Sequence, residues 1–532
     1  TIHSATPINP YDVLNAGGRL KNIEDTGIVD DAVCGFEKDF FNIKAGSEVW
    51  FGVLILYNEN SDLKEILSTI KVFTQNKRVQ DYLGAEMDFW QEFFNSLDTR
   101  YRELMDSDNI LSTAVVFLKM AQVREENTEV AKPNGQIVAS LPPGMWNITW
   151  LRDMVYSILA LIEIGARKEA LDAIRFTLNA DVGYYKDYVG VEYQFSVCRY
   201  FGDGMEESDS NEDGPNIEFD GAGLFLIAIS KYVMKYGMDD IKDYADTVFK
   251  GFADVIVSLI DEEGLVKKDS SIWERHLNGK EKHFTYTQIT ALAGICGAIY
   301  LAEEMNAHHK TKIYKDVYKI LRENIFNKLV HKDNYFVSSL EEFKMYVGYL
   351  DASVVEAINF GLVEPNNIIS RKTIDVMKNL KTIGGGYMRN DDGDWYDRQE
   401  WVFIDLRIAS AMKKIGNEDS ANKLIMRIKN YTESNNSQFS ELITENGISV
   451  AGSIPMIGFG AGAYILATLG ESYKRCTLAS IDGGLEIGSD NLLEDEAYFK
   501  DEGDHALVIG GETSFDTSND NHIAACSCSI IE

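Results

Sequence analysis

Residues 287–321 read "TQITALAGICGAIYLAEEMNAHHKTKIYKDVYKIL", and this stretch decides the fold class. The first half is apolar almost all round, which indicates a helix that is buried on every side. A short polar break follows, and the second half has apolar residues on one face only. That pattern is typical of a helix that covers a core and faces water. The stretch therefore predicts a helical hairpin with a buried first helix and an outer second helix.

Three further stretches share this design, at 159–178, 230–250 and 410–431. In each, one helix ends near Gly or Asn, a few residues pass, and an amphipathic helix begins. Gly suits the left-handed residue that ends a helix. Because stacked hairpins bury the first helix of every pair, the repetition predicts a two-layer ring of helices, an α/α toroid. The predicted fold class is therefore mainly α.

The two ends of the chain differ from this pattern. Residues 1–75 are predicted as a short N-terminal β region, because "SEVWFGVLILYN" (47–58) is rich in Val, Ile and aromatic residues. Residues 76–98 are predicted as a linker helix, and residues 99–475 as the helical domain. Residues 476–532 are acidic and rich in Gly, so they are predicted as a β-like or irregular C-terminal extension.

The composition excludes some partners. The 532 residues carry a formal net charge of −33, which repels nucleic acid and anionic membranes and suits a neutral substrate. No apolar run approaches the roughly 18 residues of a membrane span. The six cysteines include no pairs at zinc-finger spacing, so no structural zinc is expected. The first residue is Thr1, which leaves a removed signal peptide, and therefore both secretion and a cytoplasmic location, open; the oligomeric state is also open.

Charged and aromatic residues gather at four junctions where a loop enters a predicted buried helix. Each set alone would also suit a helix-start ion pair or a solvated loop. Together they predict a sugar pocket, since aromatic faces cover sugar rings, charged groups bind hydroxyls, and two separated carboxylates can cleave a glycosidic bond. The sets are Trp150 with Arg152 and Asp153, Trp273 with Glu274, Arg389 with Trp401, and Glu441 with Glu445.

Three motifs resemble glycoside hydrolase family 15, the glucoamylases, glucodextranases and family-15 trehalases. They are "TWLRD" (149–153), "IWERHLNGKEKHFTY" (272–286) and "SELITENG" (440–447), in the family's order and spacing. The resemblance implies an (α/α)6 barrel, in agreement with the predicted ring, and an N-terminal β-sandwich of which residues 1–75 would be a shortened version. It also implies inverting, exo-acting hydrolysis that releases β-glucose from the non-reducing end of an α-glucan or α-glucobiose.

The resemblance also implies roles for the motif residues. Glu274 corresponds to the general acid, whose pKa burial against Trp273 would raise, and Glu441 corresponds to the general base. An inverting pair needs its carboxyl groups roughly 6.5–9.5 Å apart. The reaction needs no metal or other cofactor. Residues that would hold the terminal glucose or wall the pocket are Trp150, Arg152, Asp153, Trp273, Arg389 and Trp401.

One departure from the family leaves the substrate open. Arg275 stands where the family often has a second Glu that contacts the leaving sugar, so the linkage that is cleaved stays undecided. Two other functions also stay open: an inverting disaccharide phosphorylase, and a sugar-binding protein that has lost catalysis.

A calcium loop competes with the family motif for one segment. "DSNEDG" (209–214) fits the start of such a loop, but the twelfth position is Asp220 rather than Glu and the eighth is Asn216. The overlapping "EDGPN" (212–216) resembles the family's Asp-Gly-Pro loop. A structural calcium ion is therefore left open and is not favoured.

Overall fold

The computed structural model describes residues 2–4, 16, 19, 34–36, 42–54, 63–274, 280–345, 350–391 and 393–470. The described residues up to Phe93 form one compact unit, and those from Phe94 onward form a second, larger unit. The predicted C-terminal extension, 476–532, lies outside the described residues. Arg275 lies outside them as well.

The first unit is less β-like than predicted. Strand β1 (Ile2–Ser4) pairs antiparallel with β2 (Cys34–Phe36), but the described residues 47–54 contain no strand. The strand prediction for this run is therefore wrong over those residues. Val49 and Phe51 are 47% and 59% exposed, and β-forming residues make a strand only where a partner strand pairs with them.

The helices of this part of the chain follow the strands. Helix α2 (Leu63–Thr74) lies inside the region predicted as β. Helix α3 (Val79–Ser96) lies within residues 76–98, where a helix is predicted.

All four predicted helical hairpins are present in the second unit. Gly165 ends helix α6 with φ of 85°, the left-handed conformation that the sequence pattern requires. The hairpins are α6 (Leu151–Ile164) with α7 (Arg167–Asn179), α9 (Asp220–Tyr236) with the irregular run α10 (Ala245–Val248), η2 (Phe249–Ala253) and α11 (Asp254–Ser258), α12 (Thr285–Glu304) with α13 (His308–Lys328), and α18 (Val402–Lys414) with α19 (Glu418–Ser434).

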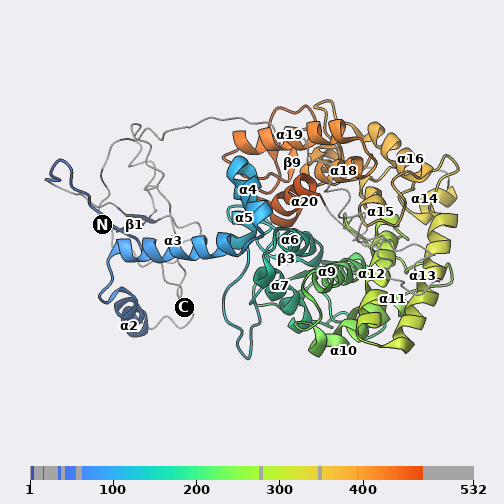
Figure 1. Ribbon diagram of the computed structural model, residues 1–532, viewed down its shortest axis with the longest axis horizontal. Helices are drawn as coiled ribbons and strands as arrows, with labels where there is room; N and C mark the ends of the chain where they lie inside the picture. The colour runs from blue at the N-terminus through green and yellow to red at the C-terminus, as the bar shows by residue number, and fades with distance from the viewer. Residues whose placement is uncertain are drawn as a thin grey trace. The chain divides into compact units, whose positions relative to one another are not determined.

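The inner helices close into a ring (Figure 1). Helix α6 packs on α9, α9 on α12, α12 on α15, α15 on α18, α18 on α20, and α20 again on α6. Helix α7 packs on α6, α13 on α12 and α19 on α18, so each lies outside its partner. The described fold is thus an (α/α)6 barrel, and the prediction of a mainly α toroid is confirmed. The remaining members are α5 (Asn109–Met120), η3 (Ala352–Val355) with α15 (Glu356–Asn359), α16 (Ile368–Met377), and η5 (Ile457–Gly462) with α20 (Ala463–Leu469).

Close packing in the ring depends on two glycines. A Cβ on Gly294 of α12 would lie 2.6 Å from the Cα of Gly223 on α9, and a Cβ on Gly223 would lie 2.3 Å from the carbonyl oxygen of Thr290. Backbone therefore meets backbone where α9 crosses α12. This explains why the small residues of "TALAGICGA" are needed in an inner helix.

Helix α12 also corrects one expectation. Among the described residues it is the one helix that is long and apolar enough to cross a membrane, yet 89% of its apolar window is buried inside the protein. The prediction that no apolar run approaches membrane-span length is therefore wrong. Helix α12 is apolar along its length because it packs on α9 and α13 inside the barrel, which makes it a core helix.

A buried ion pair joins the inner helices inside the barrel. Arg407 of α18 donates from Nη2 to Glu356 Oε2 of α15 at 2.8 Å, and both side chains are 1% exposed. The guanidinium also lies 5.1 Å from the ring centroid of Tyr156 on α6. Tyr156 shares a hydrogen bond of 3.1 Å with the hydroxyl of Tyr286 on α12. Four inner helices thus meet at one charged network.

We expect Glu356→Gln to lower the free energy of unfolding by about 3–5 kcal/mol, because it leaves the Arg407 charge buried without its partner while conserving volume. Urea unfolding measures the effect. Asp316→Asn is the control, since it removes a charge from the exposed Lys312–Asp316 pair of α13, worth about 0–1 kcal/mol. Equal losses in the two variants would contradict the role of the buried pair.

Candidate active site

The predicted site residues lie where the inner helices begin. Trp150 ends strand β3 (Thr149–Trp150) directly before α6, and Trp401 ends strand β8 (Glu400–Trp401) directly before α18. Asp220 is the first residue of α9. Because the inner helices are alternate members of a ring of hairpins, their N-termini share one end of the barrel. Helix dipoles favour negative charge at that end.

Small sheets hold the two tryptophans in place. Trp150 pairs with Arg199 of strand β4 (Arg199–Tyr200), whose guanidinium lies 5.3 Å from the Trp150 ring centroid. Trp401 pairs with Leu442 of strand β9 (Leu442–Ile443). Each sheet fixes the backbone immediately before an inner helix, so the indole rings cannot shift independently of the barrel.

Arg152 is the centre of the first group of charges. From the first turn of α6 its Nη1 donates to Glu218 Oε2 at 2.6 Å and to Asp220 Oδ2 at 3.1 Å. Its Nη2 lies 3.6 Å from Glu274 Oε1. Burial alone would lower the pKa of Arg152, but the charges of Glu218 and Asp220 raise it well above its ordinary value. One cation thus binds the starts of two inner helices and the loop before a third.

Glu274 has an unusual backbone conformation and a perturbed carboxyl group. Its φ is +51°, a left-handed value that is rare for a residue with a side chain. Burial raises its pKa, in the predicted direction, while the charge of Arg152 opposes the rise. The buried Trp150 Nε1 makes no hydrogen bond of good geometry, yet lies close enough to favour the ionised form of Glu274.

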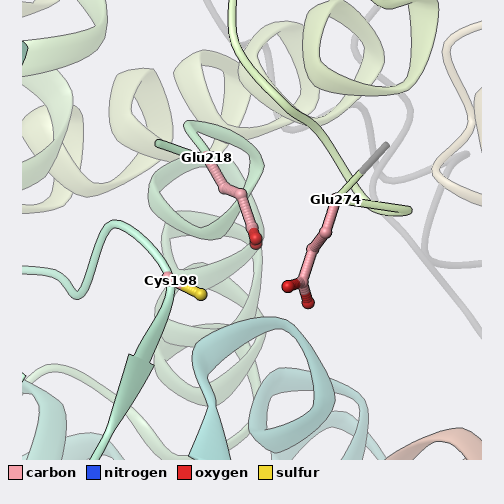
Figure 2. A group of neighbouring side chains, drawn as sticks. All are labelled: Cys198, Glu218 and Glu274. Carbon is pink, nitrogen blue, oxygen red and sulfur yellow. The ribbon is translucent and has the colours of Figure 1, made fainter. Parts of the chain in front are cut away.

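Glu218 and Cys198 are close neighbours of Glu274. Figure 2 shows the three side chains pointing toward one another, with one sulfur or oxygen atom from each lying within 4.8 Å of the others. Asn216 Nδ2 donates to Glu218 Oε1 at 2.7 Å and Glu274 Oε2 at 3.3 Å, and lies 3.5 Å from Cys198 Sγ. The side-chain amide of Asn216 therefore lies among all three groups and bridges the two carboxyl groups.

Asp153 shows that the two predicted catalytic carboxyl groups share one neighbourhood. Burial raises its pKa to about 7, against the charge of Arg152, and the charges of both Glu274 and Glu441 add to the rise. Glu274 and Glu441 come from loops more than 160 residues apart in sequence, and the charges of both act on Asp153 at the start of α6.

Glu441 accepts hydrogen bonds on both carboxyl oxygens. Trp146 Nε1 donates to Oε1 at 3.1 Å, and the hydroxyl of Tyr396 donates to the same oxygen. The backbone N–H of Ser453 donates to Oε2 at 2.8 Å. A Cβ on Gly452 would lie 2.5 Å from Oε2, so the loop needs Gly to pass this close. The carboxylate is fixed from three directions.

Arg389 lies among aromatic rings. Its guanidinium is 4.4 Å from the ring centroid of Trp401, 5.0 Å from that of Trp273 and 5.1 Å from that of Tyr396, and its Nε donates to Asp397. The ring centroids of Trp273 and Trp401 are 5.3 Å apart. These contacts stabilise a cation on an aromatic wall.

Trp273 contributes to the wall in a way that the sequence did not indicate. Its Nε1 donates to Asp351 Oδ1 at 3.0 Å, and Asp351 also accepts from the backbone N–H of Ser353 at the start of η3. The indole whose N–H acts on Glu274 is that of Trp150. Trp273, which was predicted to bury Glu274, therefore hydrogen-bonds through its indole N–H to the segment that begins the next inner helix.

The barrel brings most predicted site residues together. Trp150, Arg152, Asp153 and Glu274 meet at the starts of α6, α9 and α12, and Trp273, Arg389 and Trp401 form one aromatic group. Glu441 joins them through Trp146 and Tyr396, whose rings pack on Trp150 and Trp401. Arg275 lies outside the described residues. The sequence reasoning missed Asn216, Glu218, Trp146 and Tyr396. A signal existed for the first two, since "GPNIEFD" puts polar groups directly before a buried helix.

The ends of the possible calcium loop lie in two different ion pairs. Asp209 accepts from Arg199 Nη1 at 2.9 Å, while Asp220 pairs with Arg152. Residues Ser210–Asn211 and Gly214–Pro215 form a two-stranded hairpin between them. Both end carboxylates of the loop therefore already have an arginine as partner, and a structural calcium ion here is left open.

Known proteins share both the sequence pattern and the fold. The model of the family described as glycosyl hydrolases family 15 matches residues 118–388. A trehalase from Thermoplasma acidophilum is 23% identical over 319 residues, which make up 53% of this chain and 51% of the trehalase. The chain thus spans about half the length of this curated relative.

Solved structures resemble the barrel at low sequence identity, so they show the fold alone. A bacterial glucoamylase complexed with acarbose is 14% identical with a TM-score of 0.60, over 80% of this chain and 62% of that one. A glucoamylase from Saccharomycopsis fibuligera is 12% identical with a TM-score of 0.55, over 70% of this chain and 96% of that one. A wild-type glycosidase is 16% identical with a TM-score of 0.55, over 70% and 98%.

We expect Arg152→Met to lower the free energy of unfolding by about 3–5 kcal/mol near neutral pH, because Glu218, Asp220 and Glu274 lose their shared cation. The pKa values of Glu218 and Glu274 in the folded protein then rise further above the unfolded value of about 4.3. The folded state binds more protons in that window, so the loss grows as the pH rises from about 4. Thermal unfolding at several pH values measures it; a deficit that is independent of pH would contradict this account.

Proposed function

Because the chain belongs to glycosyl hydrolases family 15, we propose that it is an inverting hydrolase of α-glucosides that removes glucose from the non-reducing end. Glu274 is the general acid and Glu441 the general base. The observation that carries the proposal is the chain of contacts between the two glutamates: Tyr396 donates to Glu441, and the Arg389 guanidinium lies 5.1 Å from the ring centroid of Tyr396 and 5.0 Å from that of Trp273, which directly precedes Glu274. Two carboxyl groups that flank the scissile bond are what glycosidic hydrolysis requires.

The two carboxyl groups have surroundings that suit different roles. Burial raises the pKa of Glu274, which favours a carboxyl group that still carries a proton. Glu441 accepts hydrogen bonds from Trp146, Tyr396 and the backbone of Ser453, which fixes a carboxylate in one orientation. In the proposed reaction Glu274 gives its proton to the glycosidic oxygen. Glu441 takes a proton from the water that attacks the opposite face of the sugar.

The remaining residues would bind the sugar. Arg152 and Asp153 hold hydroxyl groups of the terminal glucose, and Arg389 adds a further charged donor. Trp150, Trp273 and Trp401 cover the apolar faces of the sugar rings. No metal ion takes part in the proposed chemistry. The related trehalase supports the inclusion of trehalose among the candidate substrates, beside α-linked glucans and glucobioses.

A panel of α-glucobioses that includes trehalose tests the reaction. We expect proton NMR to record β-glucose as the first product, because water attacks from the face opposite the leaving group when the two carboxyl groups are roughly 6.5–9.5 Å apart. α-Glucose as the first product would exclude inversion. Release of glucose 1-phosphate only when phosphate is present would favour a phosphorylase instead.

Glu274→Gln and Glu441→Gln should each reduce kcat by at least about 100-fold, the usual contribution of a positioned acid or base. Glu445→Gln is the matched control, because Glu445 lies four residues after Glu441 and is exposed. It should keep the wild-type rate. Undiminished turnover in Glu274→Gln would exclude Glu274 as the general acid. Sugar binding without any turnover in the wild-type chain would leave a sugar-binding protein rather than this enzyme.

Tyr396→Phe should lower kcat about tenfold with little change in KM, because a hydrogen bond to a charged group contributes about 1.5–3 kcal/mol and here orients the base. Tyr184→Phe serves as the control. It also removes a hydroxyl that donates to a carboxylate, but Tyr184 is 56% exposed and bonds Asp181, outside the site. Equal effects of the two substitutions would argue against a role for Tyr396 in holding Glu441.

A further inference from the structure

Glu218 and Glu274 are connected twice. Arg152 donates from Nη1 to Glu218 Oε2 at 2.6 Å, and its Nη2 lies 3.6 Å from Glu274 Oε1. On the other side, Asn216 Nδ2 donates to Glu218 Oε1 at 2.7 Å and to Glu274 Oε2 at 3.3 Å. Figure 2 shows the two carboxyl groups converging from separate segments. Two rigid donors thus hold two acidic groups side by side.

The charges around this pair do not balance if every acid is ionised. Arg152 faces Glu218, Asp220 and Glu274, and Asp153 lies beside them at the start of α6. The second cation, Arg199, pairs with Glu207 and Asp209 on its own hairpin. The thiol of Cys198 is also buried here. The side chain of Glu218 is 4% exposed and that of Glu274 is 23% exposed, so water screens the repulsion between the carboxylates only weakly.

We propose that Glu218 is a positioning residue that forms, with Glu274, a carboxyl pair that binds one proton between them in the free enzyme. The inference rests on the proposed function of Glu274 as the acid. Two close carboxyl groups cannot both ionise easily, and they release their protons as a unit. Burial raises the pKa of Glu218 well above its ordinary value, and the charge of Glu274 raises it further.

The pair gives the acid a supply of protons. When Glu274 transfers its proton to the leaving oxygen, both members of the pair carry charge, and their repulsion favours the return of one proton from water. The departing sugar takes the original proton, and Glu441 loses to solvent the proton it received. Glu218 itself forms and breaks no bond to the substrate.

The pH dependence of kcat/KM tests the pair in the protein that turns over. In Glu218→Gln, Glu274 still faces Arg152 but no longer the negative charge of Glu218, so its proton is lost more easily. We expect the alkaline limb of the profile to move at least about one unit toward acid pH, while activity at low pH is largely kept. A residue with only a structural role would lower activity at every pH and leave the limb where it was.

Asp220→Asn is the matched control. It removes one charge from the same guanidinium, at 3.1 Å, but Asn216 does not connect Asp220 to Glu274. We expect a clearly smaller displacement of the limb than in Glu218→Gln. Equal displacements would overturn the pair, because they would show a general charge effect around Arg152.

A direct titration separates failure of the pair from failure of the proposed function. Carbon-13 NMR of chains labelled at the Glu carboxyl carbons, with Glu218→Gln and Glu274→Gln as assignment variants, needs no turnover. We expect one carboxyl carbon of the pair to titrate above the ordinary Glu range in the wild-type chain, and the remaining one to titrate lower in either variant. Unchanged titration of Glu274 in Glu218→Gln would overturn the inference. A normal paired titration without hydrolysis of any glucoside would instead overturn the proposed function alone.

Discussion

The buried guanidinium of Arg152 is the interaction on which the arrangement of the site depends. It lies in the first turn of α6 and meets Glu218 and Asp220 at the start of α9 and Glu274 in the loop before α12. A buried charge without partners would cost several kcal/mol, so these acidic groups must be near it whenever the protein is folded. Folding of the ring and assembly of the site are therefore one event.

On the side of the site that contains Glu441, neutral donors and aromatic rings hold the loops together, as Arg152 does around Glu274. Glu441 precedes strand β9, which pairs with β8 and so with the start of α18. Its carboxylate is fixed by Trp146 from the segment before α6 and by Tyr396 from the segment before α18. In both halves, loops that are far apart in sequence are tied together at the N-terminal end of the barrel. The long polar loops are thus ordered by the site that they build.

Periodicity predicted the ring because burial of a helix on all sides leaves a direct mark on composition, as in the inner helix at 285–304. Aromatic residues beside charged ones also pointed to Trp150, Arg152 and Glu274. The run at 47–54 misled, since strand-forming residues do not specify a partner strand. Trp146 and Tyr396 could not be found in the sequence. Their importance comes from which carboxyl group they contact, and only the closed barrel determines that.

The same limit explains why adjacency in sequence is a poor guide to the electrostatics of a carboxyl group. Trp273 precedes Glu274, yet its indole N–H binds Asp351, and the indole that acts on Glu274 is that of Trp150 from another hairpin. Glu218 is 56 residues earlier in the sequence, yet one of its carboxyl oxygens lies within 4.8 Å of a carboxyl oxygen of Glu274. What distinguishes Glu274 from Glu441 is therefore the set of distant groups around each: one cation and a second acid for Glu274, and three fixed donors for Glu441. The barrel supplies these two environments from different hairpins, so one can change without the other.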